Sequence, residues 1–413
     1  MPRAQQFIVG LDIGTSKVAC VVVEVRESRP AHVVGYGEAP SRGIRKGVVV
    51  NLDSTVEAIR SAVEQAELMA QVSVDSVIVG IAGAHVRSFN SRGVVSVTGK
   101  DRAVTREDVT RVLAAARAVS IPPDREVVHV LPQEFVVDGQ GGIHTPPAGM
   151  VGTKLEANVH IVTASSMAIQ NIVTCANRAG IEVRETVLEQ LAASEAVLSN
   201  DERDLGVALI DVGGGTVDYA IFERGSILHT SSLPVGGGHF SNDLAVGLRT
   251  PVEEAERLKL RHGVALSSMV RDDEEIEVPT VGGRRPRSLS RRILAEILQP
   301  RAEEVFQLVN EEITRAGYDR VLNAGIVLTG GAALLPGMAE AAERLFEVPV
   351  RLGVPQGLAG LVEPAPGPEH ATVLGLALYG VNHPVARTPV FPVSVGPIVR
   401  WRESVRQFFA ELF

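Results

Sequence analysis

The sequence predicts an α/β protein built from two similar halves, chiefly because one turn motif occurs twice. A Gly-containing turn at residues 11–17 (LDIGTSK) lies between two apolar, β-branched runs. A related turn with three consecutive glycines lies between two further apolar runs at residues 210–218 (IDVGGGTVD). Each pattern predicts two antiparallel strands joined by a tight turn. Two such turns in related contexts indicate a duplicated domain with a ligand in the cleft between the copies.

The residues of the two turns suit the phosphates of a nucleotide. Glycine tolerates positive φ and lets backbone N–H groups approach a phosphate closely. Asp12 and Asp211 are expected to face Mg²⁺, which prefers carboxylate oxygens and keeps most of its waters. A single Asp-Gly turn between strands usually has no function beyond the turn itself. The hypothesis of an actin-fold ATPase therefore rests on the occurrence of two such turns. The sequence contains neither a P-loop nor a Rossmann pattern, which excludes those two nucleotide-binding folds.

Composition narrows the class of protein further. At 413 residues the chain exceeds the size at which one core usually stops growing, so two domains are expected. A formal charge of −9 argues against a nucleic-acid partner, which would need a basic face. Cys20 and Cys175 have no metal-binding pattern around them and are expected to be buried thiols. The sequence has no basic-then-apolar leader and no run of the roughly 20 apolar residues that span a bilayer.

Hydrophobic periodicity and turn signals predict the elements in order. Thr105 and Asp108 form a capping-box pattern that starts a helix, and residues 271–290 are a polar stretch with blocks of like charge. Further helices are expected at residues 54–69, 165–179, 188–198, 241–248, 252–261 and 290–316, and strands at residues 76–81, 93–97, 126–131, 134–137, 157–162 and 324–328.

These elements group into two halves with an insertion and a tail. The α+β pattern of residues 84–161 predicts a small self-contained subdomain inserted into the first half. Pro-rich sequence after residue 382 predicts a linker. The predicted limits are residues 1–83 and 162–199 for the first half, 84–161 for the insertion, 200–382 for the second half (with about 243–300 as its smaller subdomain), 383–396 for a flexible linker and 397–413 for an amphipathic helix.

Other residues are candidates for the same nucleotide site. Glu189 opens a predicted helix, where its carboxylate could orient attacking water or could simply suit the helix dipole. Residues 330–332 (GGA) follow a strand, and their backbone could accept adenine and ribose. Glu256 and Lys259 share a helical face, as ligand contacts or as a solvated ion pair. Residues 236–238 (GGG) could bring a helix N-terminus to phosphate or loosen a loop.

With these residues in view, the chain resembles the FtsA family, actin homologues that tie the division tubulin FtsZ to the bacterial inner membrane. The resemblance implies duplicated ribonuclease-H-like domains of the actin and chaperone-ATPase kind, with a different subdomain inserted in the first half. Gln190 departs from the family, which commonly has proline there, and residues 271–292 match it poorly. The matching segments are residues 12–16 and 211–216 (the phosphate motifs), Glu189 (the water-orienting position), 256–259 (the adenosine-contacting helix), 330–332 (the adenosine loop) and 371–375 (the second connecting helix).

The resemblance implies ATP and Mg²⁺ as ligands, with Glu189 as the catalytic residue of at most a slow ATPase and Asp12 and Asp211 at the metal. The residues expected to bind ATP are Asp12, Gly14, Thr15, Ser16, Lys17, Asp211, Gly213, Gly214, Gly215, Thr216, Asp218, Gly237, Gly238, Glu256, Lys259, Gly330, Gly331 and Ala332.

The same resemblance implies a peripheral protein on the cytoplasmic face of the inner membrane at the division site. Its expected partners are the FtsZ C-terminal tail, further copies of itself in a filament, membrane lipid, and other divisome membrane proteins, for which the inserted subdomain is the expected contact. Arg291, Arg292 and Arg301 on the predicted helix at residues 290–316 are the hypothesis for the FtsZ contact, unless they only form a solvated face.

The end of the chain has the pattern of an amphipathic helix that lies in the membrane surface. Its apolar side chains recur at helical spacing, with arginines beside them, and include the only tryptophan of the chain. The alternative is a terminal helix that packs on the body of the protein. The residues expected to touch lipid are Ile398, Trp401, Arg402, Val405, Phe408, Phe409 and Leu412.

Two other functions remain open from sequence. A small-molecule kinase of the actin superfamily would need a second substrate pocket and a catalytic base, and no carboxylate outside the phosphate motifs obviously supplies one. Another actin-like scaffold, of the MreB type or the pilus-assembly type, would share the nucleotide site, and the pilus type would also share the inserted subdomain. The C-terminal tail favours the FtsA-like hypothesis over both.

Overall fold

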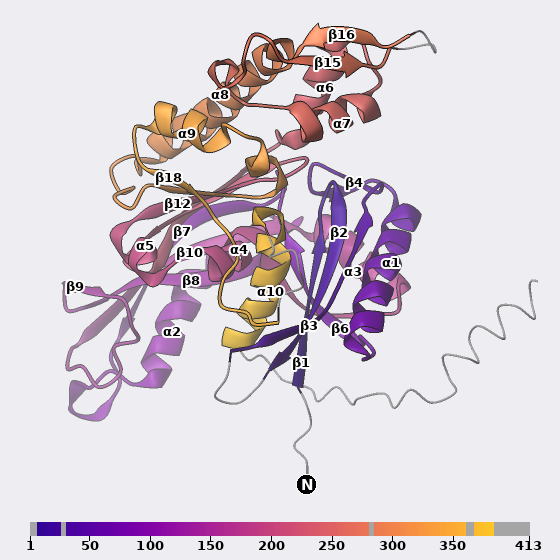
Figure 1. Ribbon diagram of the computed structural model, residues 1–413. Coiled ribbons are helices and arrows are strands. Elements are labelled where there is room, and N and C mark those ends of the chain that lie inside the picture. Colours follow the sequence, from indigo (N-terminus) through magenta and orange to yellow (C-terminus); the bar gives the residue numbers. More distant parts are fainter. Residues whose placement is uncertain (1–5, 26–29, 281–284, 361–366, 384–413) are drawn as a thin grey trace, which may run out of the picture.

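A computed structural model describes residues 6–25, 30–280, 285–360 and 367–383 of the chain. These residues form three large sheets, two short β-hairpins and the helices that cover them (Figure 1). None of the helices in this described part is long and apolar enough to cross a bilayer. The predicted linker after His383 and all seven lipid-contact residues of the tail lie outside the described residues.

The first large sheet has the strand order β11-β6-β1-β2-β3. Strand β1 pairs with β2 in antiparallel fashion and with β6 in parallel fashion, as the predicted turn between β1 and β2 requires. Helices α1 and α3 pack on one face of the sheet and α10 on the other. The bounds are β1 (Gln6–Ile13), β2 (Lys17–Val25), β3 (His32–Pro40), β6 (Ser76–Ile81), β11 (Glu182–Leu188), α1 (Leu52–Ala70), α3 (Ser166–Arg178) and α10 (Ala371–Asn382).

The second large sheet repeats the first in strand order and direction. Its order is β14-β13-β12-β17-β18, with β12 antiparallel to β13 and parallel to β17. The outer pairs also correspond, since β2–β3 and β13–β14 are antiparallel while β6–β11 and β17–β18 are parallel. The expected duplication is therefore present at the level of whole sheets. The bounds are β12 (Val207–Val212), β13 (Val217–Glu223), β14 (Ser226–Leu233), β17 (Ile326–Thr329) and β18 (Val350–Leu352).

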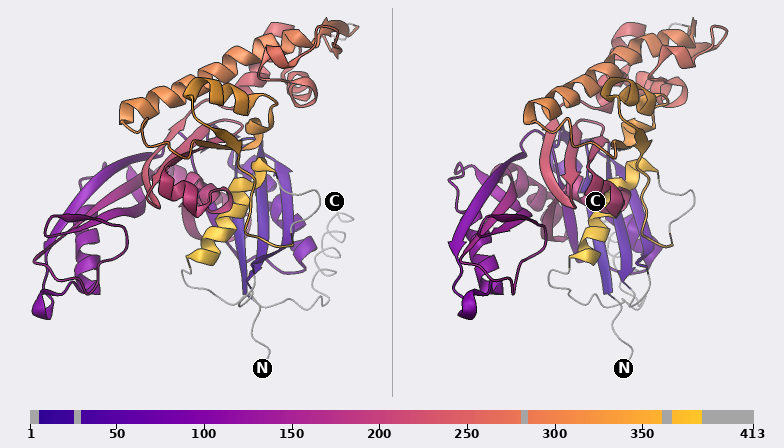
Figure 2. Two further views of the ribbon diagram at one scale, coloured as in Figure 1. Left: turned by 60° about the vertical axis from the view of Figure 1, so that its left-hand side comes forward. Right: turned by 90° about the vertical axis from the view of Figure 1, so that its left-hand side faces the viewer.

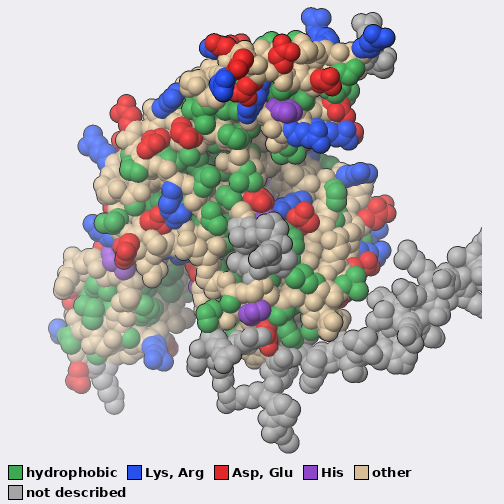
Figure 3. Space-filling model, in the orientation of Figure 1, with side chains coloured by type: hydrophobic (Ala, Val, Ile, Leu, Met, Phe, Trp, Pro, Cys, Tyr) green, Lys and Arg blue, Asp and Glu red, His purple; other side chains and the backbone are tan. Residues whose placement is uncertain are grey.

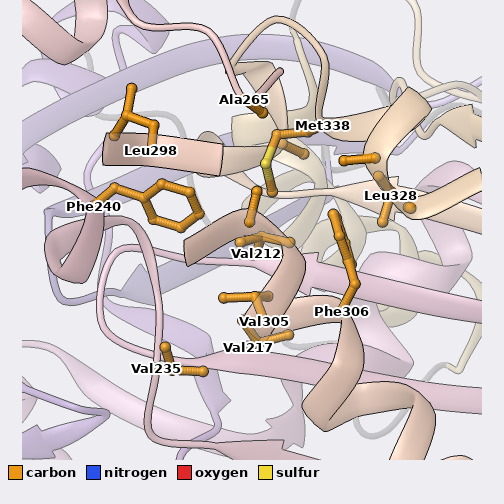
Figure 4. Packing of buried hydrophobic residues seen from close by; sticks show 14 of the residues in the cluster. Val212, Val217, Val235, Phe240, Ala265, Leu298, Val305, Phe306, Leu328 and Met338 are labelled. Carbon is orange, nitrogen blue, oxygen red and sulfur yellow. The ribbon is translucent and has the colours of Figure 1, made fainter. Parts of the chain in front are cut away.

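The helices of the second half enclose its largest apolar core. Phe240, Leu298, Phe306 and Met338 come from three different helices and pack in the same core (Figure 4). The polar stretch at residues 271–290, for which no element was predicted, contains a β-hairpin whose Ile276 and Val278 point into that core. The bounds are α6 (Gly237–Leu248), α7 (Val252–His262), β15 (Glu275–Val278), β16 (Arg287–Ser290), α8 (Arg291–Ala316) and α9 (Met338–Phe346).

A third sheet, of order β7-β10-β8-β9, forms a subdomain with its own apolar core under α2. The predicted capping box is confirmed, since Thr105 and Asp108 bond reciprocally at the start of α2. The two strands predicted at residues 126–131 and 134–137 are wrong as separate elements. They form one strand, because Gln133 is an extra residue in a bulge and does not end the pairing. The bounds are β7 (Arg87–Ser96), α2 (Arg106–Arg117), β8 (Arg125–Val137), β9 (Gln140–Ile143) and β10 (Lys154–Ser165).

This subdomain projects to one side of the body and joins it along the edge of β14 (Figure 2). The joint is polar. His160 is fully buried there, with its Nε2 3.0 Å from the Thr230 hydroxyl, and Gln133 donates to the Ile227 carbonyl at 2.8 Å. Ser88 also donates to the Thr230 carbonyl at 2.8 Å. The inserted subdomain is thereby tied to the sheet that carries the second Gly-rich turn.

Two helices cross where the two large sheets meet, and Figure 1 shows them at the centre of the molecule. They are α4 (Glu189–Val197) and α10, and they approach so closely that a Cβ on Gly375 would overlap the Ala192 carbonyl oxygen. The other elements are β4 (Ile44–Arg45), β5 (Val48–Val49), α5 (Asn200–Leu205) and short 3₁₀ turns at Lys100–Arg102, Ser267–Met269, Gly331–Leu334 and Pro368–His370.

We expect Gly375→Ala to destabilise the protein, because its new methyl group meets backbone that cannot move without separating the two helices. Overpacking of this kind costs about 1–3 kcal/mol, whereas Ala itself favours a helix by about 1 kcal/mol over Gly. The matched control is Gly247→Ala in α6, where the nearest atom is the far end of the Ile297 side chain. Urea unfolding should show a lower midpoint for the first variant only, and equal midpoints would contradict the tight crossing.

Candidate functional site

The two predicted Gly-rich turns have the same local structure. In the first, the Gly14 amide donates to the Lys17 carbonyl at 3.0 Å, and in the second the Gly213 amide donates to the Thr216 carbonyl at 3.0 Å. Each turn joins two antiparallel strands at the same position in its sheet. The duplication inferred from sequence therefore extends to the hydrogen bonds of the turns.

The two turns face and touch each other across the molecule. A Cβ on Gly215 would lie 2.6 Å from Thr15 Oγ1, and one on Gly214 would overlap Ser16 Oγ. Glycine is required in the second turn because the side chains of the first turn occupy the space. A small pocket opens beside this contact, and its lining comes from both halves: Ile13, Gly14, Thr15, Gly47, Gly80, Ala82, Ile172, Glu189 and Thr216.

Four carboxyl groups gather around the turns, and burial raises the pKa of each. The pKa of Asp12 rises to about 6, with Lys17 opposing the shift, and that of Asp211 rises to about 7 with repulsion from Asp218 and Asp12 adding to burial. The pKa of Glu189 is raised well above its ordinary value by burial and then by the three aspartates. Burial also raises the pKa of Asp218. Such a site is short of positive charge and favours a cation.

The described residues contain no group of three or more His, Cys, Asp or Glu side chains placed to hold a metal ion. Asp12 and Asp211, the two predicted metal residues, lie one on each turn. This donor set fits Mg²⁺, which binds proteins through one or two carboxylates and takes its other ligands from phosphate and water. The carboxylate of Asp211 is oriented by the Thr372 hydroxyl, which donates to it at 3.1 Å.

Glu189 begins α4 as predicted, and its carboxylate lies in the pocket. The absent side chain of Gly80 makes room for it, since a Cβ there would be 2.8 Å from Glu189 Cγ. The next residue, Gln190, is fully buried and donates through Nε2 to the Ser231 carbonyl at 3.3 Å and to Asp218 at 3.4 Å. The residue that departs from the family pattern thus bonds to the second half through a side-chain amide that proline lacks.

The start of α6 differs from the prediction. The helix begins at Gly237, four residues before the expected Ser241, because the Gly237 and Gly238 amides donate to the carbonyls of Gly213 and Gly214 at 2.8 Å each. These bonds stack the helix directly on the second turn. Both amides are used in doing so, and in this arrangement they are not directed at a phosphate.

Glu256 and Lys259 share one face of α7, as predicted, and join the start of α6. The Lys259 ammonium donates to Glu256 at 2.8 Å, to Ser241 Oγ at 2.9 Å and to the Gly237 carbonyl at 3.0 Å. All three of its protons are engaged. The sequence prediction missed Ser241, whose buried hydroxyl also bonds to Glu256, because nothing in the sequence marks one serine in an amphipathic helix.

The predicted adenosine loop lies against the second turn. Gly330 has a φ of +86°, and a Cβ there would overlap an Asp211 carboxylate oxygen and lie 2.6 Å from the Val212 carbonyl. Ala332 approaches Gly237, where a Cβ would be 3.2 Å from the alanine methyl group. Gly331 starts a short 3₁₀ turn beside them.

Lys17 has partners that the sequence did not indicate. Its ammonium donates to Glu38 at 3.1 Å and approaches the Tyr36 hydroxyl at 3.5 Å, and that hydroxyl donates to Glu38 at 2.6 Å. Tyr36 and Glu38 lie two apart on β3, where alternation places them on the same face of the sheet. Gly47 and Gly80 were missed as well, because each reaches the pocket only through the tertiary fold.

We expect Asp211→Asn to stabilise the ligand-free, metal-free protein at pH 8. A carboxyl group whose pKa rises from 3.8 to about 7 on folding contributes stability that is complete below about pH 4 and is lost as pH rises through 7. The amide does not ionise, so its advantage should grow between pH 5 and pH 8. Melting temperatures in EDTA measure this, with Asp53→Asn, a surface ion-pair partner of Arg178, as the control. An advantage that is the same at both pH values would contradict the raised pKa.

We expect Gly330→Ala to abolish nucleotide binding, because the methyl group would displace the Asp211 carboxylate. The matched control is Gly317→Ala, which has a similar φ of +81° and nothing within 4 Å of the new methyl group. Both variants place a non-Gly residue at positive φ, and the backbone strain is greater at Gly330, whose ψ of 163° falls where almost only glycine is found, than at Gly317, whose ψ is 23°. Equilibrium binding of Mg·ATP and Mg·ADP tests this, and equal affinities in the two variants would rule out the collision.

The amino-acid sequence of this chain is similar to those of a known protein family. The family described as "Cell division protein FtsA" matches residues 208–375, and the SHS2 domain inserted in FtsA matches residues 83–163. The chain is 49% identical to the cell division protein FtsA of Pseudomonas aeruginosa over 92% of this chain and 90% of the relative. It is 42% identical to that of Escherichia coli (91% and 90%) and 38% identical to that of Bacillus subtilis (92% and 84%).

Solved structures with low identity share the fold. The PilM–PilN type IV pilus biogenesis complex contains a chain with a TM-score of 0.65 at 18% identity, covering 91% of this chain and 98% of that one. MreB5 of Spiroplasma citri bound to ADP has a TM-score of 0.52 at 15% identity, covering 91% and 97%. The predicted actin-like α/β fold with an inserted subdomain is thereby confirmed. Sequence identity of 38–49% over more than 90% of the chain shows that it belongs to the FtsA family of actin-like cell-division proteins.

Proposed function

We propose that this protein binds Mg·ATP between its two halves and works as a filament-forming division protein that attaches FtsZ to the inner membrane. The observation that carries the nucleotide site is the contact of the two Gly-rich turns among four carboxyl groups of raised pKa. One turn comes from each half, so a ligand bound there holds the halves together. Family membership supports the division role over a kinase or another scaffold.

Within this proposal the residues of the site divide the work. Backbone N–H groups of the two turns receive the phosphates, Asp12 and Asp211 hold Mg²⁺ with water and phosphate oxygens, and Glu189 orients the attacking water. Glu256, Lys259 and the loop at residues 330–332 take the adenosine end. Mg²⁺ supplies the charge neutralisation that the four carboxyl groups need. Hydrolysis is at most slow, and the protein acts chiefly through assembly and recruitment.

Membrane attachment is assigned to the tail at residues 397–413. Six large apolar side chains contribute roughly 1.5–3 kcal/mol each when buried, and three arginines add about 1 kcal/mol each at an anionic surface. The costs of association and ordering absorb much of this sum. A filament presents many tails at once, so avidity makes a marginal anchor firm. The location that follows is the cytoplasmic face of the inner membrane at the division site.

The FtsZ contact is placed on the smaller part of the second half, which is built around α6 to α8. Basic and acidic side chains are interspersed over this end of the molecule (Figure 3). Acidic side chains of a partner would bind there by replacing the carboxylates that now pair with these arginines. Other divisome membrane proteins are assigned to the inserted subdomain. The pairs concerned are Arg291 with Glu274 (2.6 Å), Arg292 with Asp272 and Arg301 with Asp243 (2.6 Å).

The membrane part of the proposal is tested with Trp401, the only tryptophan of the chain. Titration of the purified protein with anionic liposomes should shift tryptophan emission to the blue, because the indole enters the headgroup region. The shift should be larger with Mg·ATP if assembly supplies avidity.

Two controls accompany this titration. Trp401→Phe keeps the apolar face and should still float with liposomes, and a chain truncated after Val395 should not. Emission that is already blue in buffer and does not respond to lipid would place the tail on the body and reject the proposed anchor.

A further inference from the structure

A short hairpin lies at the edge of the phosphate pocket. Strands β4 and β5 pair through Ile44 with Val49 and Arg45 with Val48, which leaves Lys46 and Gly47 as a two-residue turn. Their φ values of +52° and +75° suit a type I′ turn, which needs positive φ at both positions. Gly47 lines the pocket together with residues of both Gly-rich turns and Glu189. Lys46 is therefore adjacent to the pocket in the chain.

Backbone contacts hold the tip of this hairpin in place. A Cβ on Gly47 would lie 2.7 Å from the Ala82 carbonyl and 2.9 Å from Gly83 Cα, so the turn rests directly on the chain that follows β6. That chain is itself part of the site, because the Gly83 backbone is hydrogen-bonded to Asp218 and Ala82 lines the pocket. The position of Lys46 is thus fixed relative to the acidic residues.

The base of the hairpin is fixed as well. The Ser41 amide donates to the Ser16 carbonyl at 3.0 Å, which ties this segment to the first Gly-rich turn. The amides of Val50 and Asn51 donate to the Gly43 carbonyl at 2.8 and 3.1 Å and close the loop at the start of α1. The first Gly-rich turn is therefore hydrogen-bonded to the base of the hairpin and also lies next to its tip at the pocket.

The charges of the site explain what this hairpin could supply. A bound triphosphate adds negative charge beside four carboxyl groups, and phosphoryl groups are normally stabilised by cations. Lys17 is paired with Glu38, and Lys259 has three acceptors of its own. Arg45 and Lys46, in contrast, are exposed and make no ion pair with any residue that the structure describes.

We propose that Lys46 binds the terminal phosphate of the nucleotide from the turn between β4 and β5. The inference rests on the nucleotide site of the proposed function and adds a ligand to it. Lys46 is favoured over Arg45 because it is at the tip of the hairpin, directly before pocket-lining Gly47, while Arg45 lies one residue further away on β4. A lysine ammonium on a flexible stem is a common partner for phosphate.

The test compares Mg·ATP with Mg·ADP binding by calorimetry in the full-length protein. Lys46→Gln should weaken ATP binding about tenfold, or about 1.4 kcal/mol, and ADP binding by less than about twofold. Lys46→Arg, which keeps the charge, should restore most of the ATP affinity. The matched control is Arg224→Gln, because Arg224 and Gly225 form the same kind of turn (φ of +52° and +74°) between β13 and β14, away from the pocket lining.

Equal weakening of ATP and ADP, or no weakening of either, would overturn the assignment of Lys46. So would a failure of Lys46→Arg to regain ATP affinity, or an equal loss in Arg224→Gln. If the unmodified protein binds neither ATP nor ADP, the proposed function is rejected together with this inference. That outcome is distinguishable because none of the variants then shows nucleotide binding either. Lys46 is exposed, so Lys46→Gln should not change the melting temperature of the protein without ligand. If it does, ATP affinity of the Lys46→Arg variant shows whether the loss of binding comes from the lost charge or from the lost stability.

Discussion

The contact between the two Gly-rich turns constrains the rest of the structure. The side chains of Thr15 and Ser16 occupy the space that side chains at residues 214 and 215 would need. Helix α6 then stacks on the second turn through two backbone bonds, and Gly330 packs against the Asp211 carboxylate. Any change in the spacing of the turns must therefore move the smaller part of the second half and the loop at residues 330–332 together. This linkage is the physical basis on which a ligand between the turns could change the shape of the whole molecule.

The same contact concentrates negative charge where little water reaches it. Asp12, Asp211, Asp218 and Glu189 are each destabilised in their charged forms, and three of them repel Glu189. These raised pKa values lower the stability of the ligand-free protein at neutral pH, and such perturbed groups are typical of functional sites. The buried side chain of Gln190 joins this cluster to β14 and so to the edge on which the inserted subdomain rests. Polar contacts thus form a path from these carboxyl groups to the insertion.

Much of the fold and part of the site could be predicted from the sequence. The turns were recognisable because glycine and aspartate between apolar runs form a local sequence pattern that occurs twice, although the positive φ expected of their glycines is not found and the need for Gly214 and Gly215 comes from the side chains of Ser16 and Thr15. The capping box of α2 was recognisable for the same local reason. The register of the strands was not recognisable, since the bulge at Gln133 exists only in relation to β10. The hairpin of β15 and β16 was missed because it is held by apolar side chains that pack in a core distant in sequence. The start of α6 was placed too late because its first amides bond to a turn more than twenty residues earlier.

By itself, the sequence determined the duplicated architecture, the identity of the two turns and the residue types at the candidate site, because these follow from patterns along the chain. Only the tertiary structure decided which partners those residues have within the protein. Lys17 and Lys259 were predicted as ligands from their neighbours in sequence, yet each is engaged by side chains from other elements. Gly47 and Gly80 carried no local signal, and they line the pocket because the segments that bear them pack beside the first turn. Charge pairing and close approach depend on distances between remote residues, which no single stretch of sequence specifies.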